Sequence, residues 1–368
     1  MNVAYYLGSL NRGGAEMLLL DICRKIEHAP YRIILIYRNE GELSDSFKST
    51  GIPMFRIKPK GLKLRYFFQL RRLLKCEKVQ VLHAQTLTNS VIGVIITMFT
   101  GIRLVATFHG FYRSWIDALY RHIVMWNADA MVFVSKDLRE WYLKHSLFCP
   151  RRRCYVVYNG INFDKLDVDY VVPDFLVKSE AGKKDAVRLA MVGNFTGVRS
   201  QIVVCKALKL LKSQGFKKID LFFIGKKVDT EPRYYDECIK YCVENEIMDI
   251  VHFVGSRGDV PAVLQNVDGF VYSSIRDSFG IAVVEALASG LPVVVNDWKV
   301  MVEIIQNKEW ASFFRSNDEK DCCEKIKQLI ENIAVRKQLA QDYKQKVRDA
   351  YSIEEHIDNL NKVYEAVV

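Results

Sequence analysis

The sequence predicts an α/β protein with two parallel β-sheets, one in each half of the chain. Apolar runs of strand length alternate with amphipathic stretches of helical periodicity, which is the pattern of strand–helix–strand units. The alternation starts a second time at residues 187–193, so it predicts two Rossmann-like units. The length of 368 residues agrees, because a single core rarely grows that large.

The predicted strands are short, apolar and bounded by polar or glycine-containing segments. They fall at residues 2–8, 32–38, 54–58, 79–85, 103–110, 130–135 and 154–160 in the first half, and at 187–193, 219–225, 251–255, 269–274 and 292–297 in the second. From about residue 318 to the end the pattern is helical. Ligands of such sheets bind at the carboxyl ends of the strands, and two units leave a cleft between them, so functional residues are expected there.

Composition and targeting signals indicate a globular protein of the cytoplasm. Half of the residues are hydrophobic and about a quarter are charged, which is normal for a globular chain. The first residues run into a predicted strand without a basic, cleavable leader. The longest apolar run, residues 91–102, is too short to span a bilayer. The nine cysteines lack paired C-x-x-C spacing and are expected to be reduced core residues.

The positive charge is concentrated in the first half. Residues 1–165 contain 25 Lys and Arg against 12 Asp and Glu. Residues 56–78 alone carry nine basic side chains against one acid, with Leu64, Phe67, Phe68, Arg71 and Leu74 at helical spacing. This stretch is either an ordinary crossover helix with a solvated face or a contact for anionic lipid headgroups. A second basic run at 150–154 adds to the positive electrostatic field of the first half.

One stretch in the second half, RDSFGIAVVEALASGLPVVV at 276–295, combines features of an anion site. Asp277 and Glu285 lie eight positions apart around a Phe-Gly pair. Asp277 and Ser278 are predicted N-cap residues of a helix that ends near Gly290. The amides at the start of that helix suit a phosphate or a sugar hydroxyl. The alternative is that Asp277 only caps the helix and Glu285 is a solvated acid.

This stretch resembles the signature of the family 4 retaining glycosyltransferases. Other segments agree in order and spacing, namely SLNRGGAEMLL, TFHGFY, VFVSKDLREWY, VVYNGIN and VHFVGSRGDVPAVLQNVDGFVYSS. The resemblance covers nearly the whole chain. It implies a GT-B fold of two facing Rossmann-like domains with a central cleft. The implied domains are 1–165 for the acceptor and 166–349 for the nucleotide sugar, with a C-terminal helix, 350–368, packing back on the first domain. A polar connection between them is expected at 162–184.

The resemblance also implies roles for individual residues. Glu285 would accept hydrogen bonds from the donor's ribose, and Asp277 would engage hydroxyls of the donor sugar. His109, at the end of a predicted strand, would lie close to that sugar, whereas His83 is a weaker candidate at a comparable place. The remaining donor contacts would be backbone amides of Phe279, Gly280 and Ile281 at the helix end, and of Gly13 and Gly14 beside the diphosphate.

The chain departs from the family pattern at several positions. Asn194 stands where an Arg is expected and Arg199 where a Lys is expected, so Arg199 is left to neutralise the departing diphosphate unless Lys226, Lys227 or Lys299 compensates. The first acid is Asp277 rather than a Glu. After the predicted strand at 292–297 the family often has a glycine pair before an acid, whereas this chain has the acid, Glu303, without the glycines. Arg257 lies on a loop where the family contacts the base, although Asp259 and Pro261 also suit plain helix initiation there.

The resulting prediction is a retaining, metal-independent enzyme without a cofactor that moves a hexose-type sugar from a nucleotide diphosphate sugar to a glycan. His109, Asp277 and Arg199 are the predicted catalytic residues. A polyprenyl-linked acceptor, a peripheral membrane contact and a place in capsule, exopolysaccharide or O-antigen (lipopolysaccharide) assembly follow from the resemblance and the basic first half. The alternatives are a nucleotide-sugar epimerase, a solute-binding protein, or a nucleic-acid-binding protein, for which no motif is present.

Overall fold

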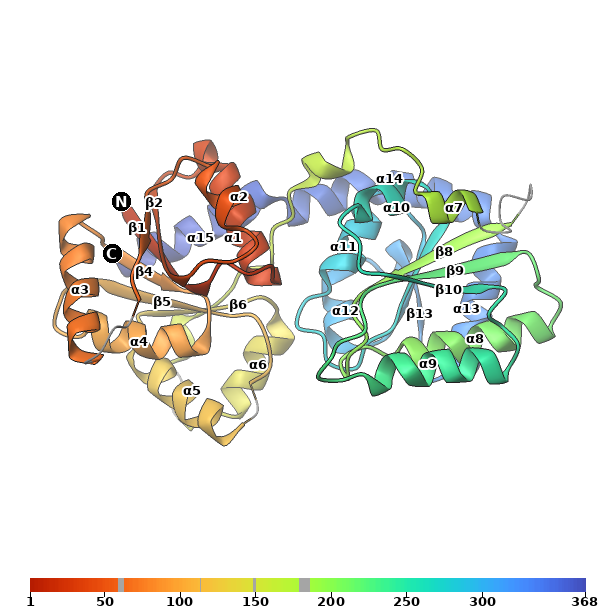
Figure 1. Ribbon diagram of the computed structural model, residues 1–368, viewed down its shortest axis with the longest axis horizontal. Coiled ribbons are helices and arrows are strands. Elements are labelled where there is room, and N and C mark those ends of the chain that lie inside the picture. The colour runs from red at the N-terminus through yellow and green to blue at the C-terminus, as the bar shows by residue number, and fades with distance from the viewer. Residues whose placement is uncertain (59–62, 113, 148–149, 179–185) are drawn as a thin grey trace. The chain divides into compact units, whose positions relative to one another are not determined.

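The computed structural model describes residues 1–58, 63–112, 114–147, 150–178 and 186–368 (Figure 1). The chain forms two compact units, Met1–Asn162 with Tyr351–Val368, and Phe163–Ala350. Part of the expected connection, 179–184, and residues 59–62 of the basic stretch lie outside the described residues, as does the side chain of Leu64. In the part of the chain that the structure describes, no helix is both long and apolar enough to cross a membrane.

The first unit contains a seven-stranded parallel sheet, and all seven predicted strands are present. In spatial order the strands are β3 (Met54–Arg56), β2 (Arg32–Asn39), β1 (Asn2–Ser9), β4 (Val81–Ala84), β5 (Arg103–Phe108), β6 (Ala130–Phe133) and β7 (Cys154–Val156). Tyr5 in β1 stands opposite Leu35 of β2 and His83 of β4. The chain therefore adds strands in one direction from β1 to β3 and in the other from β4 to β7.

Helices cover both faces of this sheet. They are α1 (Gly14–Arg24), α2 (Ser44–Lys48), α3 (Lys63–Cys76), α4 (Leu87–Thr97), α5 (Trp115–Asn127), α6 (Lys136–Lys144) and α15 (Ile353–Val367). Alternate side chains of β1 serve the two faces. Tyr5 lies in the core with residues of α1 and α15, whereas the hydroxyl of Tyr6 is hydrogen-bonded to that of Tyr66 in α3.

The C-terminal helix α15 is part of the first unit, as the fold prediction implies. The Ile161 amide donates to the Tyr351 carbonyl at 2.9 Å, and the Ile353 amide donates back to Ile161 at 3.1 Å. Gly160 lies against this junction, and a Cβ there would be 2.6 Å from the His356 Cβ and 2.8 Å from the Ile353 Cα. Only a residue without a side chain lets the two segments approach so closely.

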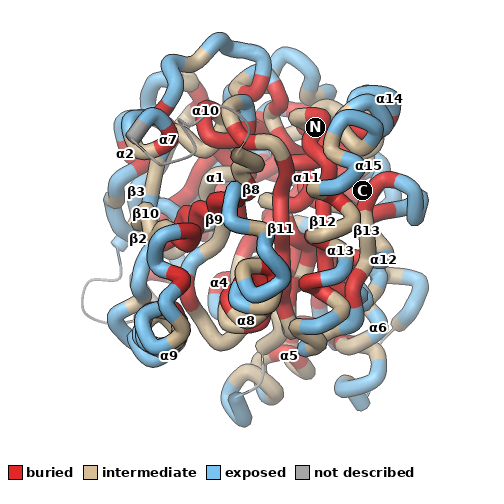
Figure 2. Tube along the Cα trace, turned by 90° about the vertical axis from the view of Figure 1, so that its right-hand side faces the viewer, coloured by how far each residue is buried: buried red, intermediate tan, exposed pale blue. Residues whose placement is uncertain are grey.

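The second unit contains a six-stranded parallel sheet. Its spatial order is β10 (Val251–Gly255), β9 (Ile219–Ile224), β8 (Val187–Val192), β11 (Gly269–Tyr272), β12 (Val293–Asn296) and β13 (Ala311–Phe314). The five predicted strands are present, and β13 is an addition that the sequence analysis missed. Figure 2 shows β11 and β12 as buried, in agreement with their continuous apolar sequences.

The helices of the second unit also alternate with its strands. They are α7 (Asp174–Lys178), α8 (Gln201–Ser213), α9 (Arg233–Glu244), α10 (Val260–Gln265), α11 (Ile281–Ala288), α12 (Lys299–Ile304), α13 (Glu319–Glu331) and α14 (Ile333–Tyr351). In each unit the strand order reverses once, between β1 and β4 and between β8 and β11. The loops that follow these strand pairs diverge, and this is where parallel sheets bind ligands.

The thiols agree with the sequence prediction. The eight cysteines that the structure describes are free, and all of them except Cys76 are buried. Burial raises the pKa of the Cys23 thiol well above its ordinary value, as expected for an unreactive core residue.

We predict that Gly160→Ala destabilises the first unit by about 1–3 kcal/mol, because the new methyl group overlaps α15. Chemical denaturation at neutral pH measures the change. Gly110→Ala is the matched control, since a Cβ at Gly110 meets no atom within 4 Å. An equal effect of the two substitutions would contradict this explanation of how α15 is attached.

Candidate active site

Two loops of the second unit meet where the strand order reverses. One follows β8 and the other follows β11. The Ser200 amide donates to the Ser273 carbonyl at 3.0 Å, and the Ile275 amide donates to the Val198 carbonyl at 2.9 Å. Arg199 and Ser274 form an antiparallel bridge between the same loops. These backbone bonds bring Arg199 next to Asp277, although 78 positions separate them in sequence.

The side chains of Arg199, Asp277 and Tyr272 form one cluster, which we call the acid–arginine cluster. Nη1 of Arg199 donates to Oδ2 of Asp277 at 2.9 Å. The Tyr272 hydroxyl is hydrogen-bonded to the same oxygen. The guanidinium also lies over the Tyr272 ring, 5.1 Å from its centroid. Burial raises the pKa of Tyr272 well above its ordinary value, so the phenol keeps its proton and donates a hydrogen bond to the carboxylate.

The cluster leaves polar groups for a ligand. Both bonds to Asp277 end on Oδ2, and no hydrogen bond between described residues reaches Oδ1. In the described part of the chain, Nε of Arg199 and the hydroxyls of Ser273 and Ser274 are buried without hydrogen-bond partners. Buried polar atoms in this state are uncommon in proteins, and they could donate or accept hydrogen bonds to a ligand.

The helix of the acid signature begins later than its predicted cap. Neither Asp277 nor Ser278 caps α11; the N-cap residue is Gly280, in the left-handed region at φ 94°. The prediction was wrong because the Asp277 carboxylate is engaged by Arg199 instead. A Cβ on Gly280 would lie 2.7 Å from Cε of Met301, so this position requires glycine for both conformation and space.

The start of α11 lies directly after the acid–arginine cluster. Phe279 is buried, whereas Ile281, the first helical residue, is half-buried. The first amides of a helix have no acceptor within the helix and carry its partial positive charge. Their use by a donor phosphate or sugar stays a prediction.

Glu285 lies in the middle of α11 and is not a solvated acid. Its side chain is 15% exposed, and Lys165 places its ammonium 3.2 Å from Oε1. Lys165 comes from a short 3-10 helix, Phe163–Leu166, at the start of the unit. The sequence analysis missed Lys165, because nothing in its local pattern distinguishes it from a surface lysine.

The positions that depart from the family pattern have structural partners. Asn194 accepts the Lys226 amide on its Oδ1 at 3.1 Å, which ties the end of β8 to that of β9. Lys226 and Lys299 are exposed, and Lys227 is paired with Asp236 at 2.6 Å. Glu303 lies in α12. Arg199 is thus the cation of this group that lies beside the first acid.

Arg257 is paired within its own loop. Its Nε and Nη2 donate to the two carboxylate oxygens of Asp259 at 2.7 and 2.6 Å, and this pairing lowers the pKa of Asp259. Asp259 precedes α10 without a side-chain cap bond, and Pro261 is in the first turn. Asp259 is thus the N-cap residue of α10, as expected, but its carboxylate is held by Arg257 and makes no side-chain cap bond. The backbone of this loop remains the candidate contact for a base.

In the first unit, the glycine pair precedes α1. Gly13 is the N-cap residue with extended backbone, φ −149°. A Cβ on Gly14 would meet no atom within 4 Å, and one on Gly13 would meet only the carboxyl group of Glu16. Neither backbone conformation nor packing within the unit requires glycine here. The suggested approach of a diphosphate stays a prediction.

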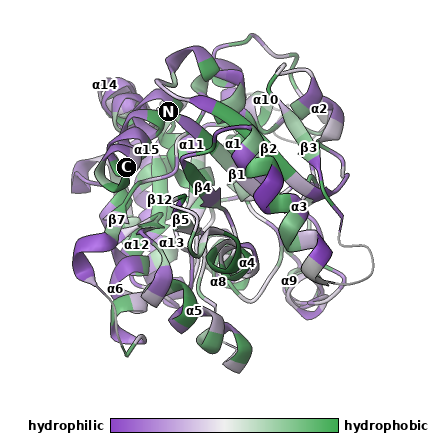
Figure 3. Ribbon diagram, turned by 90° about the vertical axis from the view of Figure 1, so that its left-hand side faces the viewer, coloured by the Kyte–Doolittle hydropathy of each residue, from purple (hydrophilic) through white to green (hydrophobic). Residues whose placement is uncertain are grey.

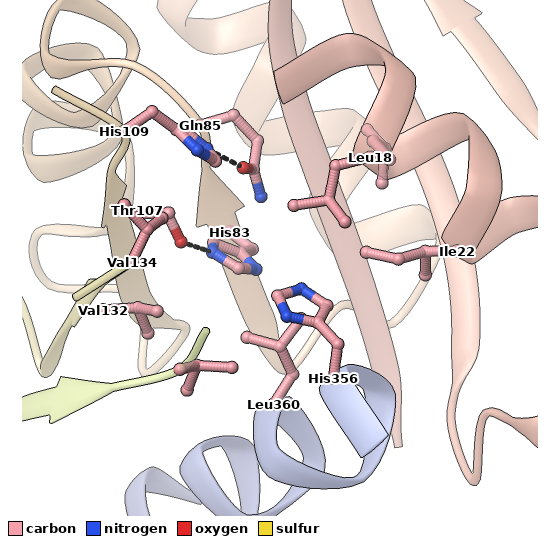
Figure 4. A pocket seen from close by; sticks show the side chains of 12 residues that line it. Leu18, Ile22, His83, Gln85, Thr107, His109, Val132, Val134, His356 and Leu360 are labelled. Carbon is pink, nitrogen blue, oxygen red and sulfur yellow. Dashed lines mark hydrogen bonds between the residues drawn. The ribbon is translucent and has the colours of Figure 1, made fainter. Parts of the chain in front are cut away.

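His109 follows β5 and lies beside the end of β4. Its Nε2 is 2.9 Å from Oε1 of Gln85, and Figure 4 shows the two side chains meeting at the edge of a small cavity. Burial lowers the pKa of His109 to about 4, so the imidazole is neutral at pH 7 and can donate or accept hydrogen bonds. Gln85 orients it. The signal that could have identified Gln85 is its place at the end of the neighbouring predicted strand.

His83 belongs to the core. It lies within β4, with Nε2 2.6 Å from Oγ1 of Thr107 and Nδ1 2.6 Å from the hydroxyl of Tyr364 in α15. The Tyr364 hydroxyl is 2.8 Å from that of Tyr5. His356 closes the same cavity and lies 2.6 Å from the Tyr158 carbonyl through Nδ1. His83 therefore attaches α15 to the sheet, and the structure does not support a site role for it.

The buried histidines predict acid sensitivity. Burial holds the pKa of His109 and of His356 at about 4, and that of His83 well below 6.5. The unfolded chain takes up these protons near pH 6.5, so the free energy of unfolding decreases as the pH falls from 6.5 towards 4. One histidine contributes a slope of up to about 1.4 kcal/mol per pH unit.

We expect His356→Gln to reduce the pH dependence of the free energy of unfolding by up to the contribution of one histidine. Denaturant unfolding at a series of pH values measures it. His28→Gln is the control because the side chain of His28 is exposed to solvent. A pH dependence that is the same in wild type and His356→Gln would contradict the assignment.

Comparison with known proteins agrees with this geometry. The family model for group 1 glycosyl transferases matches residues 174–347, and that for glycosyltransferase family 4 matches residues 12–165. A relative from Campylobacter jejuni, N,N'-diacetylbacillosaminyl-diphospho-undecaprenol alpha-1,3-N-acetylgalactosaminyltransferase, is 25% identical over 83% of this chain and 82% of its own. An Escherichia coli UDP-Gal:alpha-D-GlcNAc-diphosphoundecaprenol alpha-1,3-galactosyltransferase is 20% identical over 95% and 93%.

A solved structure extends the similarity to the fold. HepE from Anabaena, in complex with UDP, superimposes with a TM-score of 0.85 over the full length of both chains at 17% identity. The strands of the two parallel sheets follow the same order, and the two family models together span most of the sequence. Both observations lead to the same family. The chain has a two-domain GT-B fold and belongs to the family 4, group 1 glycosyltransferases.

Proposed function

We propose that this glycosyltransferase moves a hexose-type sugar from a nucleotide diphosphate sugar to a polyprenyl-linked glycan, with retention of configuration and without a metal ion. The observation that carries the proposal is the acid–arginine cluster at the reversal of strand order, beside the start of α11. The cluster combines a cation that suits a phosphate with an acid that suits a sugar hydroxyl.

The cluster suits the departure of a diphosphate. Arg199 is held through Nη1 by Asp277, which leaves another edge of the planar guanidinium for phosphate oxygens. The amides at the start of α11, a few residues after Asp277, would add partial positive charge. The leaving group would thus be stabilised by positions fixed in advance, which is how a site lowers the barrier without reorganising.

Asp277 would hold the donor sugar through Oδ1. An aspartate side chain is one carbon shorter than a glutamate. The bonds from Arg199 and Tyr272 to Oδ2 compensate for the shorter side chain by fixing the position of the carboxylate. Glu285, held by Lys165, would accept the ribose hydroxyls. His109, neutral and oriented by Gln85, would bond a sugar hydroxyl. The acceptor hydroxyl would attack on the face from which the diphosphate leaves.

A lipid-linked acceptor and a role in surface polysaccharide assembly are supported by the relatives and by charge. The names of the Campylobacter jejuni and Escherichia coli relatives specify diphosphoundecaprenol-linked sugars. Residues 1–165, where the acceptor is expected, carry the excess of basic side chains, which suits a diphosphate carrier in an anionic membrane. Because nucleotide sugars are the donors, the enzyme would act in the cytoplasm, at the inner face of the membrane.

Calorimetric titration with UDP, GDP and ADP in EDTA tests donor binding. We expect UDP to bind, since the Anabaena structure holds UDP and the Escherichia coli relative is named for UDP-Gal. Glu285→Ala should weaken UDP binding by at least about tenfold, the equivalent of one lost charged hydrogen bond. Glu324→Ala, an exposed acid on α13, is the control. Absence of binding to all three nucleotides, with and without magnesium, would contradict the proposal.

Tyr272→Phe tests the acid–arginine cluster in catalysis. The variant loses the hydrogen bond to Asp277 but keeps the ring under Arg199, so we expect kcat/KM to fall by about 10-fold to 100-fold. Acceptor-dependent release of nucleotide diphosphate measures the rate. Tyr343→Phe, which removes a buried hydroxyl bonded to Leu291 in the same unit, is the control. An unchanged kcat/KM in Tyr272→Phe would exclude the cluster from the reaction.

The stereochemical outcome is tested separately. With a donor of defined anomeric configuration and a matched acceptor, NMR of the product should show the configuration of the donor. Inversion would rule out the retaining mechanism and leave the donor-binding assignment intact.

A further inference from the structure

Helix α5 carries large apolar side chains on its solvent face. Trp115 is 78% exposed, and Ile116, Leu119 and Trp126 are also exposed. The opposite face is buried and includes Arg121, whose guanidinium donates to the His145 carbonyl at 2.8 Å. A helix that keeps an arginine inside and presents tryptophans outside is unusual for a surface in contact with water alone.

The apolar surface extends beyond α5. Helix α4 packs against α5, and the chain at its end exposes Ile95, Met98 and Phe99. Leu147, 83% exposed, is next to α5 because its amide bonds to Nε2 of His122. These side chains make up what we call the apolar face, together with those of α5. Figure 3, which looks at the first unit, shows α4 mostly in the hydrophobic colour and α5 in that colour in part.

Phe99 is held in a conformation that bulky residues rarely adopt. Its φ is 62°, and its side chain is 98% exposed. Left-handed backbone costs a non-glycine residue about 1–2 kcal/mol, and a fully exposed ring gains nothing from burial within the unit. Asparagine would suit this backbone better. Such an outlier calls for an explanation outside the folding of the unit.

Basic side chains border the apolar face. Arg151 and Arg152 are exposed at the C-terminal end of α5, where Arg153 donates to the Ala128 carbonyl at 3.3 Å. On the other side, α3 is joined to the end of α4 by Arg71, which donates to the carbonyls of Ile95, Ile96 and Met98 at 2.8–3.0 Å. Arg65, Phe68, Arg72 and Lys75 form an exposed stripe along α3.

This combination selects among the possible occupants. A second copy of the chain, docked through the same face, would bring the basic borders of the two copies towards each other. An anionic bilayer offers an apolar interior for the aromatic side chains and phosphate groups for the arginines and lysines, each worth about 1 kcal/mol near the surface. Tryptophan is also the side chain that favours the headgroup level of a membrane.

We propose that the apolar face of α4, α5 and Leu147 docks on an anionic bilayer, with Trp115 and Phe99 inserted at headgroup depth and the α3 stripe and Arg151–Arg152 on the phosphates. The inference rests on the proposed lipid-linked acceptor, because it names the surface through which the enzyme reaches such a substrate. The sequence analysis expected the membrane contact at the basic stretch 56–78, whereas this proposal assigns the main contact to the apolar face and gives the basic side chains its borders.

Vesicle flotation of the full chain at 150 mM salt (about physiological) tests the docking. Wild type should float with phosphatidylglycerol-containing vesicles and not with phosphatidylcholine vesicles. The double variant Phe99→Asn with Trp115→Ser should lose binding by at least about tenfold. Because asparagine tolerates left-handed backbone, Phe99→Asn should not lower the melting temperature. Val243→Ser with Val335→Ser, two exposed valines of the second unit, is the apolar control.

The basic border has its own test. Arg151→Gln with Arg152→Gln should reduce the preference for anionic vesicles, whereas Lys217→Gln with Lys218→Gln, an exposed pair in the second unit, should not. Brominated lipids should quench the tryptophan fluorescence of wild type more than that of Trp115→Ser. Equal flotation of wild type and the Phe99/Trp115 double variant would overturn the proposal, as would a stable wild-type dimer that the double variant converts to monomer.

UDP titration of the same proteins separates this inference from the proposed function. If the double variant binds UDP as wild type does but no longer floats, the docking surface is supported independently of catalysis. If wild type floats but binds no nucleotide, the docking stands and the donor assignment fails.

Discussion

The candidate site depends on the backbone ladder between the loops that follow β8 and β11. Three interactions of that ladder, around Ser200, Ser273 and Ile275, place Arg199 beside Asp277. Neither side chain would be stable there alone, since a largely buried charge without its partner is costly. The reversal of strand order between β8 and β11 is what makes the two loops neighbours. The chemistry of the cluster is thus a consequence of sheet topology.

The first unit uses buried polar side chains for a different purpose. His83, Tyr364 and Tyr5 form a hydrogen-bonded chain from the sheet to the C-terminal helix, and Gly160 lets that helix approach the backbone closely. His109 lies at the edge of the same cavity but projects from a strand end, where Gln85 orients it. The same residue type is thus structural within a strand and a site candidate just beyond one, because loops at strand ends meet ligands.

Much of the fold could be predicted from the sequence because hydrophobic periodicity reports strands and helices directly. β13 was missed because Ala311–Phe314 contains a serine and lacks the continuous apolar run that marks β12. The cap of α11 was misassigned because local propensity favours Asp277 and Ser278, whereas a tertiary ion pair decided the outcome. Lys165 has no local signal at all, because its partner, Glu285, is far away in sequence. Gln85 is marked only by its place at the end of a predicted strand, which does not reveal its partner, His109.

The central claim is that Arg199 and Asp277 act as one matched pair, an arginine with a shortened acid. A double-mutant cycle with Arg199→Lys and Asp277→Glu measures this most directly, using UDP-sugar affinity and turnover. Each single substitution changes the length of one partner, so each should lose at least about tenfold in kcat/KM, whereas the double variant, with a shorter cation and a longer acid, should recover most of that loss. Losses that simply add in the double variant would contradict the pairing and with it the account of the donor site.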